Sequence, residues 1–116
     1  MDKLTGDKLT RYRELIQDII RERANVKFSR GDIRALPIID PIGDHYQIFH
    51  VGWDEHRRIH GCVLHVDIIE NKFWIQYDGT SSPIAEDLLE AGVPSDDIVL
   101  GFQPAEMRSF TDFAVA

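Results

Sequence analysis

The 116-residue sequence contains a single cysteine, Cys62, so the chain can form no internal disulfide and offers no cysteine-based zinc site. No apolar run is long enough to cross a bilayer, and the N-terminus lacks the apolar core of a signal peptide. We therefore expect a cytoplasmic protein that does not bind membranes. Basic residues are also scarce, with 13 Lys and Arg against 20 Asp and Glu, and a net charge of −7 argues against unaided binding of DNA.

Patterns that carry catalysis are missing as well. The eight glycines form no phosphate-binding loop. Asp54, Asp67 and Asp78 are predicted to lie at different strand ends, so no paired-carboxylate site is indicated. We expect a protein that is not an enzyme and that needs no cofactor. One alternative stays open, which is a small-ligand binder or hydrolase that uses Tyr46, His65 and Asp67.

The composition is that of an ordinary globular protein, with 43% hydrophobic and 28% charged residues. The length suits one domain over residues 1–116, in which residues 1–6 form an extension. We predict an α+β fold. An N-terminal helix packs on a four-stranded antiparallel meander, which is followed by one or two short helices and an apolar C-terminal segment.

The stretch 45–79 is predicted to form three antiparallel strands. Glu70-Asn71 is a short polar pair between apolar residues, which is typical of a two-residue hairpin turn. This turn sets Ile68 opposite Phe73, and the same register extends to Leu64 opposite Tyr77.

The polar run 54–57 predicts the other turn, which sets Trp53 opposite Arg58 and Gln47 opposite Leu64. The two turns together predict one apolar face, which the helices would cover. Its members are Phe49, Val51, Trp53, Cys62, Leu64, Val66, Ile68, Phe73, Ile75 and Tyr77.

The opposite face of the predicted sheet mixes aromatic, histidine and polar side chains. Such a mixed face suits contact with a partner or a ligand. Its candidate residues are Tyr46, His50, His65, Asp67, Trp74 and Gln76. A row of Tyr46, His65 and Gln76 across the strands is equally consistent with a structural hydrogen-bonded ladder.

The flanking segments carry clear boundary signals. Apolar residues at spacings of three and four predict a helix over 7–24, with Thr5 as its N-cap. Residues 33–39 predict an edge strand, because Pro37 cannot donate a backbone hydrogen bond. Ser82 is predicted to cap a short helix that ends at Gly92.

The C-terminal part is predicted from apolar segments. Residues 94–97 suit the start of a second, single-turn helix, and residues 98–102 suit a short strand or a docking segment. Residues 103–111 are predicted to be loop. The last four residues are apolar and are expected to pack against the domain.

Five histidines raise the question of a metal site. On the predicted register, His50 and His65 are separated by four strand residues, about 13 Å, which is too far for one ion. His45 and His60 are predicted to point to the other face. His65 therefore lacks a third ligand beside Asp67, and no metal site is expected.

The residues just discussed resemble one family over nearly the whole chain. The matching segments are HYQIFHVGWDEHRRIHGCVLHVDI, FWIQYDGT, IAEDLLEAGVPSDDIVLGF and the ending FAVA. They resemble the XisI family, the fdxN element excision controlling factors of cyanobacteria.

This resemblance implies a role in programmed DNA rearrangement during heterocyst development, beside a site-specific recombinase and an XisH-like protein. It supplies no catalytic residues. It implies contact with DNA only through partners, with a homodimer as another use of the same surface. An antitoxin-like inhibitor of a nuclease-like XisH partner is a further alternative. The acidic balance suits binding to a basic nucleic-acid protein.

Overall fold

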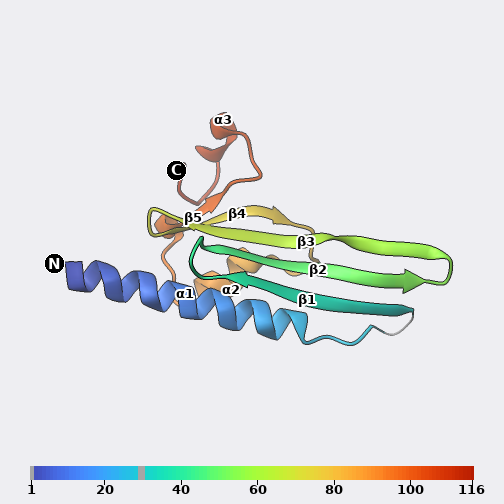
Figure 1. The fold of residues 1–116 in the computed structure, drawn as a ribbon. Helices are drawn as coiled ribbons and strands as arrows, with labels where there is room; N and C mark the ends of the chain where they lie inside the picture. The colour runs from blue at the N-terminus through green and yellow to red at the C-terminus, as the bar shows by residue number, and fades with distance from the viewer. Residues whose placement is uncertain (1, 29–30) are drawn as a thin grey trace.

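The computed structural model describes residues 2–28 and 31–116, and within these ranges it describes side chains from residue 8 onward. Its helices and strands form a molecule that extends 53 Å along its longest axis (Figure 1). They are α1 (Asp2–Ala24), β1 (Asp32–Asp40), β2 (His45–Asp54), β3 (Arg57–Ile69), β4 (Lys72–Asp78), α2 (Ile84–Glu90), the 3-10 helix η1 (Ser95–Asp97), β5 (Ile98–Leu100) and α3 (Ala105–Arg108).

The five strands form one sheet in the order β1-β2-β3-β4-β5. Strands β1 to β4 are antiparallel neighbours, as predicted, and β5 adds a parallel edge beside β4. Strand β1 is the other edge, in agreement with Pro37. The predicted α+β fold is confirmed, with a fifth strand beyond the four of the meander.

Both predicted hairpin turns are present. Trp53 pairs with Arg58, and Ile68 pairs with Phe73. Glu70 and Asn71 both adopt positive φ angles, 50° and 65°, as a two-residue hairpin turn of type I′ requires. Glu55 likewise has a φ of 57° in the other turn.

The predicted apolar face is right for Leu64, Val66, Ile68, Phe73 and Ile75, which are buried in the core. It is wrong for Phe49, Val51, Trp53, Cys62 and Tyr77, because two β-bulges change the register. In β3, Phe49 pairs with Cys62 but Ile48 pairs with Leu64, so Val63 is an extra residue. In β4, Gln76 is extra, since Ile75 pairs with Val66 and Tyr77 with His65. The predicted pairs of Leu64 with Gln47 and with Tyr77 do not form. One extra residue exchanges the two faces of the strand beyond it.

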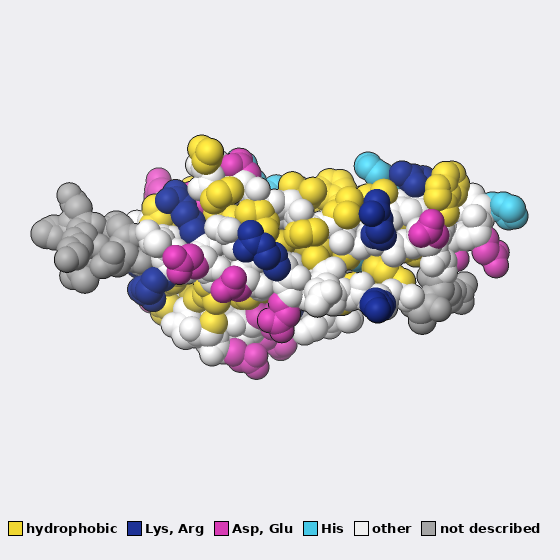
Figure 2. All heavy atoms as spheres, turned by 60° about the horizontal axis from the view of Figure 1, so that its bottom comes forward, with side chains coloured by type: hydrophobic (Ala, Val, Ile, Leu, Met, Phe, Trp, Pro, Cys, Tyr) yellow, Lys and Arg dark blue, Asp and Glu magenta, His cyan; other side chains and the backbone are white. Residues whose placement is uncertain are grey.

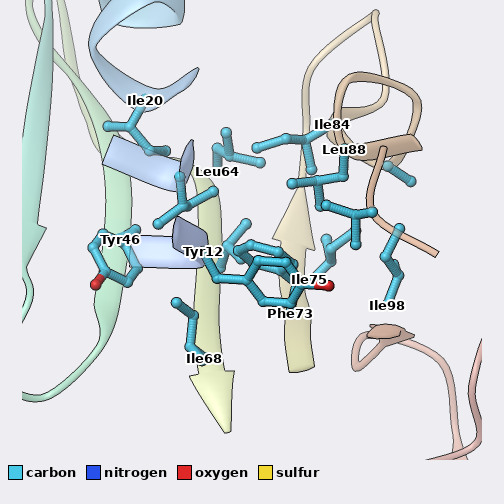
Figure 3. Close-up of a cluster of buried hydrophobic side chains, with 14 of the residues drawn as sticks. Tyr12, Ile20, Tyr46, Leu64, Ile68, Phe73, Ile75, Ile84, Leu88 and Ile98 are labelled. Atoms are coloured by element: carbon cyan, nitrogen blue, oxygen red, sulfur yellow. The ribbon is translucent and has the colours of Figure 1, made fainter. Parts of the chain in front are cut away.

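One face of the sheet carries the hydrophobic core, and we call it the inner face. Apolar side chains of α1 and α2 pack there against the sheet, as Figure 3 shows for Tyr12, Ile84 and Leu88. The rings of Tyr12 and Phe73 lie 4.7 Å apart. The strand residues buried on this face are Tyr46, Ile48, Leu64, Val66, Ile68, Phe73, Ile75 and Ile98.

Helix boundaries differ from the prediction in two places. Helix α1 begins at Asp2 rather than Asp7, so the predicted cap Thr5 lies within it, and its side chain is outside the described part. The cap of α2 is not Ser82. Instead, Pro83 holds the N-cap position and the Ile84 amide donates to Oδ2 of Asp78, at 2.8 Å.

The remaining boundaries follow the sequence signals more closely. Gly92, with a φ of +96°, ends α2 as predicted. In the segment between α1 and β1, residues 29 and 30 lie outside the described residues. Residues 103–111, predicted to be loop, contain the four-residue helix α3.

The apolar C-terminal segment packs against the domain, as predicted. Ala114 forms a parallel bridge with Val99, and its amide donates to the carbonyl of Ile98 at 2.9 Å. Phe113 contacts the core. Figure 1 places this segment and α3 on the β5 side of the sheet, whereas α1 runs along the β1 side. No helix in the described part of the chain has the length and apolarity needed to span a membrane.

A buried carboxylate joins η1 to α1. Asp97 accepts hydrogen bonds from the Tyr12 hydroxyl at 2.6 Å and from Lys8 at 2.8 Å. Burial alone raises the pKa of Asp97, but the bonds from Lys8 and Tyr12 outweigh it and lower this pKa below its ordinary value. Burial and the Asp97 carboxylate both raise the pKa of the Tyr12 phenol.

This carboxylate predicts a loss of stability in acid. The pKa of Asp97 is lower in the folded than in the unfolded chain, so the ionised carboxylate adds to the free energy of unfolding. This contribution is complete above the unfolded pKa of about 3.9, and it disappears as the pH falls through the folded-state pKa. Asp97→Asn should therefore lower the free energy of unfolding at neutral pH and flatten its decline toward about pH 2.5. Urea unfolding at several pH values measures both effects.

The exposed neighbour Asp96 provides the matched control. Asp96→Asn should keep the wild-type pH dependence. If the free energy of unfolding of Asp97→Asn falls as steeply in acid as that of the wild type, Asp97 does not contribute to the pH dependence.

Candidate functional site

The face of the sheet opposite the core, which we call the outer face, carries a cluster around Asp67. His45 stands directly opposite Asp67 on the neighbouring strand β2. His65 lies two residues before Asp67 on β3, so both side chains point to the same face. Gln76, the extra residue of the β4 bulge, reaches Asp67 from the other side. We call His45, His65, Asp67 and Gln76 the imidazole–carboxylate cluster.

The contacts in this cluster converge on one buried carboxylate. Nδ1 of His45 and Nε2 of His65 each lie 2.8 Å from the same oxygen, Oδ1 of Asp67. The side-chain amide of Gln76 donates to the other oxygen, Oδ2, at 3.2 Å. An ionised carboxylate only accepts hydrogen bonds, so the two ring nitrogens that face it must both carry protons.

Electrostatics keep this carboxylate charged. Burial raises the pKa of Asp67, but the hydrogen bonds from His45 and His65 outweigh it and hold the pKa below its usual value. The same bond raises the pKa of His45. The arrangement can hold a proton between an imidazole and the carboxylate. It also brings Nδ1 of His45, Nε2 of His65 and Oδ1 of Asp67 close together.

An aromatic and a basic side chain flank the cluster. Trp74 pairs with Asp67 across β3 and β4, and the guanidinium of Arg108 lies 5.1 Å from the centre of its indole ring. Arg108 is itself fixed by a hydrogen bond to the carbonyl of Gln103. The C-terminal segment therefore covers the outer face at Trp74.

Four of the six predicted site residues, His65, Asp67, Trp74 and Gln76, do lie together on the outer face. Tyr46 does not. It is buried in the core, where its hydroxyl donates to Oδ1 of Asp44 at 2.8 Å. The predicted constellation of Tyr46 with His65 and Asp67 therefore does not form, because the Val63 bulge separates their faces.

His50 is the other residue that the bulge separates from the cluster. It lies on the inner side, where its ring meets the edge of Phe28 at 4.9 Å. Together they line a groove of about 390 Å³ that also includes Arg23 and Thr80. His50 therefore cannot act together with His65 at one site.

The sequence prediction also missed His45, which it placed on the opposite face from His65. The signal that could have found it is Cys62-Val63-Leu64, three apolar residues that interrupt the alternation of the strand. Such an interruption is how an extra residue in a strand shows itself in sequence. With that bulge included, His45 falls opposite Asp67.

The outer face of β1, β2 and β3 carries an apolar patch away from the cluster. Leu36 pairs with Phe49, and Phe49 pairs with Cys62. None of these three is fully buried, and Trp53 nearby is 48% exposed. We call Leu36, Ile38, Phe49, Val51, Trp53 and Cys62 the outer apolar patch.

Two predictions about this patch are corrected. Phe49, Val51, Trp53 and Cys62 were expected under the helices, but the bulge turns them to the outer face. Cys62 was expected in the core, but it is only half-buried, and its thiol donates to the carbonyl of Leu64 at 3.2 Å. The β2–β3 hairpin that carries much of the patch projects beyond the helices (Figure 1).

Charges on another part of the surface are mixed in sign. In the view of Figure 2, Lys and Arg side chains are interspersed with Asp and Glu, and hydrophobic side chains reach the surface between them. The described residues on this face form no single basic patch.

The comparisons with known proteins agree with one another. The XisI protein family matches residues 6–115. A crystal structure of a XisI-like protein from Anabaena variabilis is 40% identical, with a TM-score of 0.86, and covers 93% of this chain and 99% of its own. The fdxN element excision controlling factor XisI from the same organism is 37% identical, with a TM-score of 0.80, and covers 94% and 99%. No curated protein matches the chain.

Proposed function

Because this chain belongs to the XisI family, we propose that it is a non-enzymatic accessory factor that controls programmed excision of a DNA element through protein partners. A similar protein is called an excision controlling factor, which supports the general role. The proposed partners are an XisH-like protein and, through it, a site-specific recombinase. Contact with DNA is then indirect.

The outer apolar patch is the observation that supports contact with a protein. Contiguous apolar surface on the face opposite α1 and α2 favours binding to another protein. Trp53 offers a large side chain, and Arg58 lies 5.3 Å from the centre of its ring. Tryptophan and arginine are the residues most often found to dominate binding energy in such interfaces.

The charge of the chain suggests the chemistry of the partner. A net charge of −7 favours approach to a basic protein and disfavours approach to DNA. A protein that handles nucleic acid is basic where it contacts phosphate. We therefore propose that the outer apolar patch binds a basic XisH-like protein.

The test is to measure how tightly an XisH-like protein binds to single variants of this chain. Trp53→Ala should weaken binding about 30-fold, which corresponds to about 2 kcal/mol. His50 lies on the inner side of the sheet and contributes nothing to the patch. His50→Ala should therefore leave the affinity for the XisH-like protein within about threefold of the wild-type value. Calorimetry measures both affinities.

Equal effects of Trp53→Ala and His50→Ala would remove the outer apolar patch from the proposal. Light scattering of the chain alone is the companion measurement. If Trp53→Ala converts a stable homodimer into monomers, the patch serves self-association and the proposal fails. Cleavage assays with the complex then show whether the partner is restrained, as an inhibitor would do.

A further inference from the structure

We propose that His45, His65 and Asp67 bind a divalent transition-metal ion of the zinc class, with one coordination position left open. Each of the three residues offers one ligand atom, and these atoms lie within 4.8 Å of one another. The site is independent of the proposed partner contact, and it requires only this chain.

The set of ligand atoms selects the class of ion. Two imidazole nitrogens with one carboxylate oxygen suit zinc and its neighbours, whereas magnesium and calcium require oxygen ligands. Three protein ligands with a fourth position open to water is the arrangement of zinc sites that act on or bind a further group.

The spacing of the ligand atoms fits such an ion after a small adjustment. The two nitrogens lie 2.8 Å from Oδ1 of Asp67. Tetrahedral zinc with bonds of about 2.0–2.1 Å separates its ligand atoms by about 3.3 Å. The ion takes the place of the two ring protons that point at the carboxylate. The two nitrogen–oxygen separations widen by about half an ångström, and side-chain rotations bring the two nitrogens, which lie within 4.8 Å of each other, to the same spacing.

The surroundings hold these ligands in position. Gln76 donates to Oδ2 of Asp67, which leaves Oδ1 facing the two histidines. Gly43 makes room for His45, because a Cβ at this glycine would lie 3.0 Å from Cδ2 of the imidazole ring. These contacts fix the orientation of a ligand without occupying the atom that binds.

The cluster is accessible from solvent on one side. The His45 side chain is 56% exposed, and that of His65 is 30% exposed, while Asp67 is 11% exposed. An ion can therefore enter from the histidine side, while the carboxylate forms the buried floor. The open position faces solvent, where a water molecule or a side chain of another protein completes the coordination.

Calorimetric titration of the full chain with Zn²⁺, after removal of any polyhistidine tag, tests the site. We expect one ion per chain. His45→Gln, His65→Gln and Asp67→Asn should each reduce the affinity by at least tenfold, and Gln76→Ala should reduce it by about tenfold through the carboxylate it orients. Co²⁺ should give a visible absorption band in the wild type and a much weaker one in His65→Gln.

His60→Gln is the matched control, because His60 is an exposed histidine on the same strand. It should leave affinity and stoichiometry unchanged. The proposal is overturned if the wild type binds no Zn²⁺ at a tenfold molar excess. It is also overturned if His60→Gln weakens Zn²⁺ binding as much as His45→Gln does. Because the His45 side chain is exposed, His45→Gln should leave the core intact and remove only a ligand.

Discussion

Replacing Asp44 with alanine is expected to lower the free energy of unfolding by about 3 kcal/mol, because it removes a buried charge that several groups share. Arg13 binds both carboxylate oxygens of Asp44, at 2.9 Å each. The hydroxyl of Tyr46 donates to the same carboxylate at 2.8 Å, and the Tyr46 side chain has no exposure to solvent. The substitution would leave that phenol without an acceptor in the core.

Urea unfolding at neutral pH measures this loss, and two further variants identify its source. Asp44→Asn keeps an acceptor and a residue type that tolerates the positive φ of 61°, so it should cost less than alanine. In the Asp44→Ala background, Tyr46→Phe should lower the free energy of unfolding by less than it does in the wild type. The reason is that it then removes a hydroxyl that has already lost its acceptor. Additive losses would show that the two groups act independently.

Phe73→Ala is expected to destabilise the protein by about 3–5 kcal/mol, the largest effect of a single truncation that we predict. The Phe73 side chain is fully buried at the centre of the core, between β3 and β5 and against the ring of Tyr12 (Figure 3). Its removal leaves a cavity bounded by a helix and three strands, which cannot collapse without moving α1. Chemical denaturation measures the loss.

Phe110 is the matched control, because its side chain is 81% exposed. Phe110→Ala should change the free energy of unfolding by less than about 0.5 kcal/mol. If Phe73→Ala costs no more than Phe110→Ala, the core does not depend on the packing between Phe73 and Tyr12.

The fold was predictable from sequence where short-range chemistry decides it. The pair Glu70-Asn71 identifies a tight turn by itself, and such a turn fixes the pairing of the few residues on each side. The single stripe of apolar residues in α1 also determines which side of the helix packs on the sheet. These features need no information from distant parts of the chain.

The faces of the sheet were not predictable by extending that register. Val63 adds one residue between Cys62 and Leu64, so every side chain beyond it changes face relative to β2. The residues near each turn were therefore paired correctly, while Tyr46 was assigned to the wrong partner and His50 and Trp53 were assigned to the wrong face. The three consecutive apolar residues Cys62-Val63-Leu64 mark the place of the bulge, but a register that is extended residue by residue from a turn does not include it.

The same bulge explains the mixed outcome at the candidate site. His65 and Asp67 are two residues apart on one strand, and their shared face does not depend on the register. His45 is brought to them only by pairing across the bulge. Residues within one strand were therefore predicted together correctly, and the ligand from the neighbouring strand was missed.

The two borders of the sheet are protected in different ways, which bears on how the protein behaves at high concentration. The β5 border is capped by its own chain, through the bridge between Val99 and Ala114. Within the described residues, no strand pairs with the outer border of β1. There Pro37 interrupts the row of backbone donors, and Arg34 adds a charge that a second molecule would have to bury. Edge-to-edge stacking of copies into a continuous fibril is thereby opposed at both borders of the sheet.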